Sequence, residues 1–427
     1  MILAIDLGST SFKAGVYDDQ LACIGSGSCK LKYRHGSGGE VELATDEVTT
    51  AVRQAVTQAL VGLDTAKLRA VALTSQAQTF TLGTGAGDPV MPFISWLDRR
   101  AGAACTTLQQ DDRLGEVAEH ASFPVLSPAL QLCQLRHLRD MRPEWWSADM
   151  RIVPLPSFIL WQLTGQYACD DNWAAMSGLY SMKEGAWWAA ALAACGLQVA
   201  NLPHIVRAGR VAAVTTEAAD FFGLPEGLPV ILAGNDQTAG AYGAELHRNQ
   251  ALLITLGTCQ VVYAVAPVAP SPNRLTAAGP YPGGGWYSLA AGQCGGMQIN
   301  WAKTVLADCA TDAAFDAAAA TAPPGCNGLT FELGKREQDA AWHHIALTHQ
   351  PGDFARSVLE ALVADMVRLV GLVAGKSVPE TLLVAGGGSR SAIWTRLISE
   401  MLARPLIPTE ANPLKGAAAM ARDVGQW

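Results

Sequence analysis

The sequence predicts an α/β protein that is built from two similar domains. A chain of 427 residues is longer than one hydrophobic core usually organises, so two domains are expected. The same short glycine turn occurs twice, in Ile5–Ser9 (IDLGS) and in Ile254–Thr258 (ITLGT), each time between two runs with the apolar pattern of β-strands. Hydrophobic residues make up 50% of the chain and charged residues 16%, which is typical of a compact globular protein. We therefore expect one domain at residues 1–247 and a second at residues 248–427, facing each other across a cleft.

The first half opens with strands and continues with a helix. Short strands are predicted at about 2–7, 12–18 and 21–32, because apolar and polar residues alternate there between turn residues. A helix is predicted at about 46–62 from apolar residues at i, i+3 and i+4 spacing, with Thr45 placed to cap it. Later elements of this half are expected as strands at 70–74 and 79–82, a mostly helical, tryptophan-rich region at 128–200, a strand at 230–233 and a helix from Thr238 to about Leu246.

The second half repeats the opening pattern. A β-rich segment begins at Ala251 and contains the second glycine turn. Helices at about 353–374 and 391–403 flank a predicted strand at 381–385, and a last, alanine-rich helix is predicted at about 412–423. In 128–200, the pairs Trp145-Trp146 and Trp187-Trp188 are expected to pack helices together.

The charge and the cysteines exclude several classes of function. The formal net charge is −8, so the chain offers no general basic surface for nucleic acid or an anionic membrane. The first residues read directly as a strand, without a basic segment or a long apolar stretch of the kind found in signal peptides and membrane spans. The cysteines follow no CxxC spacing, which favours free thiols in a reducing compartment. We expect a cytoplasmic protein that binds neither nucleic acid nor membrane.

The two glycine turns are candidate phosphate sites. A β-turn-β unit with glycine and hydroxyl residues presents backbone N–H groups in a tight concavity, as expected at Gly8, Ser9 and Thr10 and again at Gly257-Thr258. Asp6 lies directly beside the first turn and would repel phosphate unless a cation such as Mg²⁺ intervened. Lys13 on the outgoing strand could add a positive charge. The alternative is a pair of ordinary hairpins with Asp6 as a turn former and Lys13 in solvent.

A second candidate site follows the predicted strand at 230–233. There Gly234-Asn235-Asp236-Gln237 precedes a helix, so that Asp236 is expected at the mouth of a cleft. A carboxylate in a largely dry cleft can accept a hydroxyl proton as a general base, and Gln237 can both donate to and accept from a hydroxyl. The alternative is that Asp236 only caps the helix.

A third glycine cluster, Gly386-Gly387-Gly388-Ser389, lies at a predicted strand-to-helix turn. Glycine there permits close approach of a flat or anionic ligand, although helix packing is an alternative reason for it. The cluster lacks the GxGxxG spacing and the acidic partner of a dinucleotide-binding fold, so a Rossmann dehydrogenase is not favoured.

These motifs together resemble those of the FGGY family of carbohydrate kinases, within the actin, Hsp70 and sugar-kinase superfamily. The resemblance covers nearly the whole chain and rests on the order and joint presence of its motifs. The matching segments are the first phosphate motif at Asp6–Lys13, the sugar-side W-x-D-x-R segment at Trp96–Arg100, the catalytic-base region at Gly234–Gln237, the second phosphate motif at Leu256–Thr258, the adenosine-side motif at Leu383–Ser391 and a terminal G-A-A at Gly416–Ala418.

The resemblance implies two ribonuclease-H-like (actin-like ATPase) α/β domains, with ATP and sugar bound in the catalytic cleft. The implied reaction is in-line transfer of the γ-phosphoryl group of Mg·ATP to a sugar hydroxyl, with Asp236 as catalytic base. With the resemblance, the Mg²⁺ expected beside Asp6 has Asp6 and Asp236 as its ligands. The implied substrate-binding residues are Gln76, Gln78, Trp96, Asp98 and Gln237. The implied nucleotide-binding residues are Gly8, Ser9, Thr10, Lys13, Gly257, Thr258, Gly296, Gly387 and Gly388.

The segment Thr74–Thr79 bears on the acceptor. It occupies the place where xylulokinases show G-Q-M-H-G and glycerol kinases N-Q-R-E, and it keeps Gln76 with an uncharged Gln78. The missing Arg/Glu pair counts against glycerol, whereas Asp236-Gln237 is closer to the glycerol kinase pattern. A ketose such as xylulose is the first expectation. Ribulose, glycerol and erythritol are alternatives, as is a non-catalytic nucleotide-dependent sensor of the same superfamily.

Two further points follow from the resemblance. The family allows a homodimer. The chain is shorter than typical members around Gly334–Glu337, which leaves its regulation open.

Overall fold

The structure is a computed structural model that describes residues 1–85, 88–115, 117–271, 275–334, 340–375 and 377–425. It divides into two compact units, and neither unit is one continuous stretch of chain. Unit 1 contains Met1–Gly243, Pro267–Trp286 and Asn412–Trp427, and unit 2 contains Ala244–Ala266 and Tyr287–Ala411. The division into domains at residues 247 and 248 stays a prediction. Residues 335–337 of the shortened segment lie outside the described residues.

The centre of unit 1 is a sheet with the strand order β14-β15-β6-β1-β2-β3. Its strands are β1 (Ile2–Leu7), β2 (Ser11–Tyr17), β3 (Cys23–Lys30), β6 (Ala70–Ser75), β14 (Gly209–Ala213) and β15 (Pro229–Asn235). β1 pairs antiparallel with β2 and parallel with β6, and β6 pairs parallel with β15. The carboxyl ends of β1, β6 and β15 therefore meet at one edge of the sheet.

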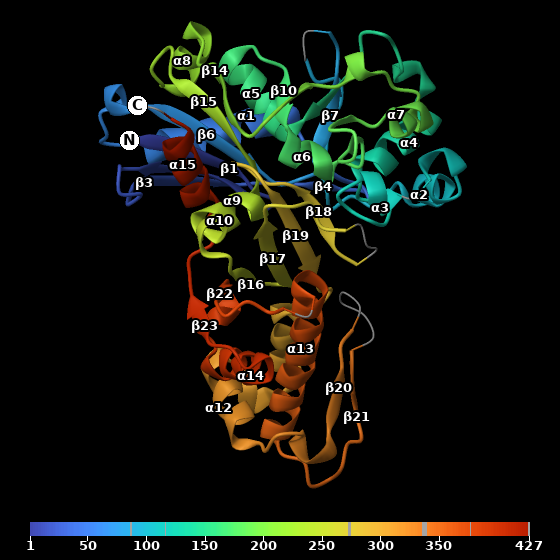
Figure 1. Cartoon of the computed structure of the whole chain (residues 1–427), viewed down its shortest axis with the longest axis vertical. Helices are drawn as coiled ribbons and strands as arrows, with labels where there is room; N and C mark the ends of the chain where they lie inside the picture. Colours follow the sequence, from blue (N-terminus) through green and yellow to red (C-terminus); the bar gives the residue numbers. More distant parts are fainter. Residues whose placement is uncertain (86–87, 116, 272–274, 335–339, 376, 426–427) are drawn as a thin grey trace. The chain divides into compact units, whose positions relative to one another are not determined.

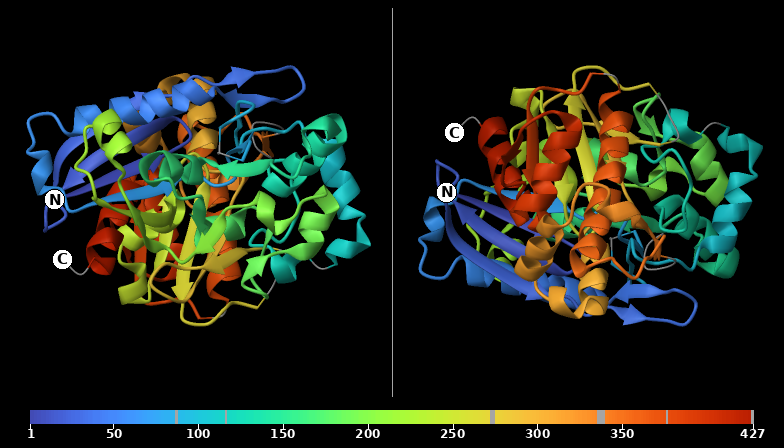
Figure 2. Two further views of the ribbon diagram at one scale, coloured as in Figure 1. Left: turned by 90° about the horizontal axis from the view of Figure 1, so that it is seen from above. Right: turned by 90° about the horizontal axis from the view of Figure 1, so that it is seen from below.

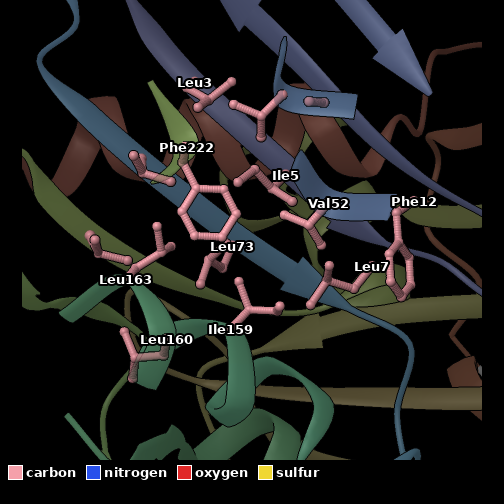
Figure 3. Packing of buried hydrophobic residues seen from close by; sticks show 14 of the residues in the cluster. Leu3, Ile5, Leu7, Phe12, Val52, Leu73, Ile159, Leu160, Leu163 and Phe222 are labelled. Carbon is pink, nitrogen blue, oxygen red and sulfur yellow. The ribbon is translucent and has the colours of Figure 1, made fainter. Parts of the chain in front are cut away.

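Helices cover both faces of this sheet. One face carries α1 (Thr45–Ala59), α5 (Leu155–Thr164) and α8 (Thr216–Phe222), and α1 lies along β2 and β3 (Figure 2). In the core of this face, Ile159, Leu163 and Phe222 surround Leu73 of β6 (Figure 3). The alternate strand residues, such as Ala4 and Ala72, are buried outside this cluster, because successive side chains of a strand point to opposite faces.

The first helix begins differently from the sequence-based expectation. Its N-cap is Ala44, which has no side chain that can cap, and Thr45 is the first helical residue. The Thr45 hydroxyl instead donates a hydrogen bond of 3.5 Å to the carbonyl of Met91. The prediction that Thr45 caps this helix was wrong, because a residue inside the first turn points its side chain away from the amides that need a cap.

The opposite face of the sheet is covered by a helix from far along the sequence. α15 (Pro413–Val424) lies against α9 (Asp236–Gly243) and against β1 and β6 (Figure 1). The contact is close, because a Cβ atom placed on Gly416 would collide with the carbonyl oxygen of Ala239, and one placed on Gly243 would lie 3.0 Å from the amide nitrogen of Gly416. Small residues on both helices therefore allow their backbones to touch.

The remainder of unit 1 forms a second hydrophobic cluster. In it, Trp187 and Trp188 are buried and Trp145 and Trp146 pack against its edge, which confirms their predicted packing role. A smaller sheet has the order β4-β5-β8-β7-β9. The elements of this part are β4 (Arg34–His35), β5 (Val41–Leu43), β7 (Phe80–Gly83), β8 (Phe93–Ile94), α2 (Gly102–Gln109), α3 (Val117–His120), α4 (Gln131–Met141), β9 (Arg151–Pro154), β10 (Ala168–Asp170), α6 (Asp171–Met176), β11 (Tyr180–Ser181), β12 (Ala186–Trp187), α7 (Ala189–Cys195), β13 (His204–Val206) and β18 (Ala277–Pro280).

Unit 2 repeats the central pattern of unit 1. Within this unit the strand order is β19-β17-β16-β22-β23, with β16 antiparallel to β17 and parallel to β22. This matches β3-β2-β1-β6-β15, so both predicted glycine turns connect equivalent antiparallel strands. The strands are β16 (Leu252–Leu256), β17 (Gln260–Ala266), β19 (Trp286–Ala291), β22 (Leu382–Ala385) and β23 (Leu406–Pro408).

The helices of unit 2 pack on this sheet around a core of their own. They are α10 (Leu246–Asn249), α11 (Gly296–Val305), α12 (Asp312–Thr321), α13 (Pro351–Ala374) and α14 (Ala392–Leu402). A hairpin of β20 (Thr330–Glu332) and β21 (Ala341–His343) lies beside α13 (Figure 1). The predicted helix 238–246 is two helices instead, since the chain turns out of α9 and Glu245 takes a left-handed φ of 58° before α10.

Two further findings concern membrane-spanning helices and the cysteines. In the described parts of the chain, no helix has both the length and the apolar character that crossing a membrane requires. All ten cysteines lie in those parts and are free thiols.

Candidate active site

Several predicted site residues of unit 1 meet at the edge where β1, β6 and β15 end. Asp6 lies near the end of β1, opposite Lys13 of β2 and Thr74 of β6 in the strand register. Asn235, which precedes Asp236, lies opposite Ser75. The sheet register thus brings together Asp6, Thr74 and the Asn235-Asp236 segment, which are far apart in the sequence. This is expected where parallel strands end side by side.

Asp6 is a buried carboxylate that has an unused oxygen. Its Oδ1 atom has no hydrogen-bond partner among the described residues. Burial and, less strongly, the nearby charge of Asp236 raise the pKa of Asp6 to about 7, against a smaller lowering by Lys13. Two carboxylates in reach of each other, one with a buried unpaired oxygen, fit the oxygen-rich environment that Mg²⁺ prefers.

Asp236 is the first residue of α9, and its side chain does not cap that helix. The cap is Asn235, whose Oδ1 accepts a 2.9 Å hydrogen bond from the amide of Thr238. Asp236 Oδ1 accepts a 2.7 Å hydrogen bond from the amide of Gln237, and the Asp236 side chain is half-buried. Burial raises the pKa of Asp236 to about 6. Asn235 is therefore the N-cap, Asp236 uses one oxygen on an amide of the first helical turn, and Gln237 is exposed directly beside it.

The first glycine turn lies against Asp6. A Cβ atom on Gly8 would be 3.1 Å from the carbonyl oxygen of Ser11 and 3.5 Å from Asp6 Oδ2. Ser9 is half-buried, and Thr10 and Lys13 are exposed. The backbone of this turn is thus available next to the carboxylate, as a phosphate site with a bridging cation would require.

Two glutamine side chains supply uncharged polar groups near this edge. Gln76 is buried, and its backbone is fixed at both polar atoms. The backbone N–H donates to the Leu7 carbonyl and the backbone carbonyl accepts from Trp173 Nε1, at 3.0 Å in both cases. Neither side-chain amide atom of Gln76 has a partner in the described structure, nor has Gln78 Oε1. Gln78 also holds a left-handed φ of 68°, which is uncommon outside glycine. Buried polar groups without partners cost free energy, so such groups commonly await a ligand or water.

The Trp96–Arg100 segment is hydrogen-bonded to the segment between β6 and β7 that contains Gln76 and Gln78. The Trp96 amide donates a 3.2 Å hydrogen bond to Thr79 Oγ1, and 37% of the Trp96 side chain is exposed. An indole in this position is accessible to a ligand.

Asp98 is arranged differently from the prediction that it binds substrate. It is completely buried, and its carboxylate accepts hydrogen bonds from the Val41 amide at 2.7 Å and from Gln134 Nε2 at 3.1 Å. It also pairs with Arg100, whose Nη2 lies 2.7 Å from Asp98 Oδ2 and 2.7 Å from Glu42. Both carboxylate oxygens accept hydrogen bonds within the protein, and these bonds hold the Trp96–Arg100 turn in place. That Asp98 binds substrate stays a prediction.

Sequence reasoning missed two residues of this region. The hydroxyl of Tyr33 is buried beside Gln76 and Ser95; burial raises the Tyr33 pKa, and those two side chains lower it by a smaller amount. Asn172 of α6 is completely buried and hydrogen-bonded to the Asp236 turn. Neither residue lies in a motif, and neither neighbours the site in sequence, so no local signal could have found them.

In unit 2 the second glycine turn contacts the start of α11. The Gly296 amide donates a 2.9 Å hydrogen bond to the Gly257 carbonyl, and the Met297 amide donates to the Thr258 carbonyl at 3.3 Å. A Cβ atom on Gly296 would lie 2.9 Å from the same Gly257 oxygen. Gly257, Thr258 and Gly296 are therefore adjacent, at the N-terminus of a helix, where backbone amides favour anions.

The third glycine cluster packs against the same turn. Gly386 has a φ of 91°, and a Cβ atom there would lie 2.6 Å from the carbonyl oxygen of Leu256. Gly388 has its Cβ position filled by Leu256 and by the Trp394 ring, so packing explains this glycine. Gly387 is exposed, and only Arg390 lies within 4 Å of its Cβ position. Packing therefore explains Gly386 and Gly388, and the approach of a ligand to Gly387 stays a prediction.

Two protein-family models match this chain. The N-terminal domain of the FGGY family of carbohydrate kinases matches residues 1–243, and the C-terminal domain of the same family matches residues 252–422. The chain belongs to the FGGY family of carbohydrate kinases. It is therefore a carbohydrate kinase, and membership implies that ATP is the phosphoryl donor.

Curated relatives of this FGGY kinase carry several substrate names. A glycerol kinase of Alkalilimnicola ehrlichii is 28% identical over 455 residues, covering 99% of this chain and 90% of the relative. An L-fuculokinase of Escherichia coli K12 is 26% identical over 359 residues, covering 79% of this chain and 73% of the relative.

Solved structures share the fold. A ligand-bound xylulose kinase from Lactobacillus acidophilus has a TM-score of 0.91 at 20% identity, covering 100% of this chain and 90% of the other. A Plasmodium falciparum glycerol kinase with ADP has a TM-score of 0.86 at 16% identity, covering 100% and 90%. These likenesses confirm the predicted two-domain, actin-like α/β fold of the family.

Proposed function

We propose that this FGGY kinase phosphorylates a hydroxyl group of a neutral polyhydroxy substrate, with Asp236 as the general base and a ketose such as xylulose as the first candidate substrate. The observation that carries the proposal is the carboxylate of Asp236, which lies at the carboxyl edge of the parallel strands next to Asp6, while Asn235 serves as the N-cap of α9. A base is most effective when its pKa lies near the working pH, and burial brings the pKa of Asp236 up to about 6.

The proposed reaction assigns each group one task. The acceptor hydroxyl gives its proton to Asp236 as its oxygen attacks the γ-phosphorus of ATP, and the bond between the γ-phosphorus and the bridging oxygen breaks to leave ADP. The turn with Gly8, Ser9 and Thr10 and the turn with Gly257 and Thr258, next to Gly296, are the proposed phosphate-binding segments. Gly387 and Gly388 are proposed on the adenosine side. Lys13, which is exposed, is proposed as a further phosphate contact.

Mg²⁺ is proposed as the cation that accompanies ATP. Asp6 and Asp236 would hold it, and the support is the unpaired, buried Oδ1 of Asp6 together with the effect of the Asp236 charge on the pKa of Asp6. When bound, the ion would neutralise charge that builds up on the phosphoryl oxygens.

The acceptor class follows from the character of the side chains at this edge. Gln76 offers a buried, uncharged amide group and Gln78 a buried amide oxygen, and the intervening Ala77 supplies no cation for an anionic acceptor. Hydroxyl groups can both donate to and accept from such amides. Trp96 and Gln237 are accessible for further contacts.

Polyols remain a second candidate class. The Asp236-Gln237 pair resembles the glycerol kinase pattern, and a glycerol kinase stands among the curated relatives. Glycerol and erythritol are therefore tested beside xylulose, together with ribulose as a second ketose. A cytoplasmic location and a homodimer are further proposals, based on the free cysteines and on the family.

The first experiment measures acceptor-dependent ADP release with Mg·ATP over D- and L-xylulose, D- and L-ribulose, glycerol, erythritol and gluconate. We expect one neutral acceptor to give rapid release and gluconate to give none. Rapid release with gluconate alone would overturn the neutral class. ATP binding without release on any acceptor would favour the sensor alternative.

The role of Asp236 is tested by Asp236→Asn. The variant should lose about 10²–10⁴-fold in kcat, because it cannot accept the proton, while ATP binding stays within a few-fold. Asp149→Asn, which neutralises an exposed carboxylate of the same unit, is the matched control and should keep full turnover. Substantial turnover by Asp236→Asn would remove Asp236 from the role of base.

A further inference from the structure

We propose that Asn172 is a positioning residue, whose side-chain amide fixes the turn that carries Asp236. The inference rests on the proposed role of Asp236 as base and adds a residue that is remote from it in sequence. Asn172 is the second residue of the short helix α6 and is completely buried in unit 1.

The side-chain amide of Asn172 uses its acceptor and both of its N–H donors. Its Oδ1 accepts a 3.0 Å hydrogen bond from the amide nitrogen of Asn235. Its Nδ2 donates to Thr238 Oγ1 at 3.1 Å and to the Pro280 carbonyl at 2.7 Å. An amide with three such partners has one orientation, because turning it over would set donors against donors.

Two of these bonds bracket Asp236 along the chain. Asn235 precedes Asp236 and Thr238 follows it by two residues, and both are completely or almost completely buried. Asn235 and Thr238 are also joined by the helix cap. The half-buried Asp236 therefore projects from a segment whose two ends are bound to one side chain.

The backbone of this segment is shaped to admit Asn172. Gly234 has a φ of 70°, and a Cβ atom there would lie only 2.8 Å from Asn172 Oδ1. Any other residue at 234 would be strained and would also push Asn172 away from the Asn235 amide. The close approach of Asn172 is thus part of the local fold.

The helix that carries Asn172 is itself held on two sides. Asp170 caps α6 by accepting a 2.7 Å hydrogen bond from the Trp173 amide. Trp173 Nε1 donates to the carbonyl of Gln76, on the proposed acceptor side. One short helix therefore connects the turn of the base with the turn of the acceptor, and Asn172 is its contact with the base.

The test is Asn172→Ala, compared with Asn201→Ala. Asn201 is an equally suitable buried asparagine of unit 1, since its Oδ1 accepts from the Gln198 amide at 2.7 Å and its Nδ2 donates to the Met150 carbonyl at 2.9 Å. Both variants lose buried hydrogen bonds and should lower the unfolding midpoint. Only Asn172→Ala should lower kcat, by about 10–100-fold as expected for a misplaced catalytic group, with acceptor KM and ATP affinity within about threefold. Equal kcat in the two variants would overturn the proposal.

A double-mutant cycle separates positioning from general damage. In the Asp236→Asn background, Asn172→Ala should reduce kcat by less than about threefold, because a residue that acts through Asp236 has nothing left to act on. A full additional 10–100-fold loss would contradict action through Asp236. If Asn172→Ala does not fold, Thr238→Val removes one partner of the same amide and enters the same cycle.

Hydrogen exchange tests the geometry without turnover. In the apo protein, Asn172→Ala should speed exchange of the Asn235 and Thr238 amides by at least about tenfold, whereas Asn201→Ala should leave them protected. Unchanged protection of those amides would overturn the proposal even if no acceptor were found. Altered protection with an inactive wild-type protein would instead contradict only the proposed function.

Discussion

At the scale of single residues, Asp170 shows how a buried carboxyl can hold a helix at a cost in stability. It is 2% exposed, and its Oδ1 accepts from the Trp173 amide at the start of α6. Burial raises its pKa to about 7, more than the hydrogen bonds from the backbone lower it. The ionised carboxylate is therefore less favourable in the folded protein than in the unfolded chain.

This pKa predicts a pH-dependent effect of Asp170→Asn. Between the ordinary pKa of 3.8 and the folded value of about 7, the folded protein binds more protons than the unfolded chain, so the contribution of Asp170 to the free energy of unfolding falls as pH rises. Asparagine keeps an oxygen for the Trp173 amide and carries no charge. The free energy of unfolding of the variant, minus that of the wild type, should increase from pH 5 to pH 8.

Denaturant titration of both proteins at the two pH values measures that difference. The value at pH 5 serves as the internal control, because there the folded wild type holds Asp170 mostly protonated. A difference that stays constant, or that decreases with pH, would show that the carboxylate is not destabilising in its place.

The sequence predicts part of the site at this scale. The position of Asp6 near the end of one strand and of Asp236 directly after another could be predicted, because the apolar pattern shows where both strands end. The structural role of Asp98 could not, because its saturating partners Val41 and Gln134 lie in distant segments that only the folded chain brings together. Asn172 was missed for the same reason.

At the scale of elements, the packing of α15 on α9 supports the helix that begins at Asp236, the proposed base. α9 begins at Asp236, and α15 touches it where Gly416 meets Ala239. The sequence predicts both helices from their small-residue patterns but not their contact, since the apolar periodicity says which face is buried and not what covers it. Helix ends were harder still, as the break between α9 and α10 shows.

Gly416→Ala should disturb this contact. The added methyl group has no room against the Ala239 carbonyl, so the helices must separate, at a cost of about 1–3 kcal/mol in the free energy of unfolding. Because α9 carries Asp236, kcat should fall as well. Thermal or denaturant unfolding, combined with the ADP-release assay, checks both effects.

Gly371→Ala is the matched control. Gly371 lies inside α13 with open space around its Cβ position, so alanine there should stabilise the protein by about 0.5–1 kcal/mol through its higher helix propensity. If Gly416→Ala were as stable as the wild type, the close contact of the two helices would not be required.

At the scale of the whole molecule, one strand arrangement occurs in both units, while the chain is divided between them unevenly. The order β3-β2-β1-β6-β15 and its counterpart β19-β17-β16-β22-β23 follow from the repeated glycine turn, which the sequence displays. The return of 267–286 and 412–427 to unit 1 is not visible in the sequence, because a pattern of elements does not state which sheet a later helix joins.

This division predicts the result of removing α15. A chain that stops at Ala411 should lose the cooperative unfolding of unit 1, because the faces of β1, β6 and α9 that α15 covers would be exposed to water. Circular dichroism melting and sugar-dependent ADP release measure the loss. Supplying residues 412–427 as a separate peptide should restore part of both signals, and a scrambled peptide should not. A shortened chain with the wild-type melt would contradict the prediction.

The place of α15 in the chain has a consequence for synthesis. A ribosome makes the strands of unit 1 first, but it must translate every residue of unit 2 before α15 leaves the exit tunnel. Until then, the nascent unit 1 has one uncovered sheet face and an α9 without support, so Asp236, the proposed base, is not yet held in place. Chains released early from translation should therefore neither consume ATP on an acceptor nor escape the chaperones that bind exposed apolar surface.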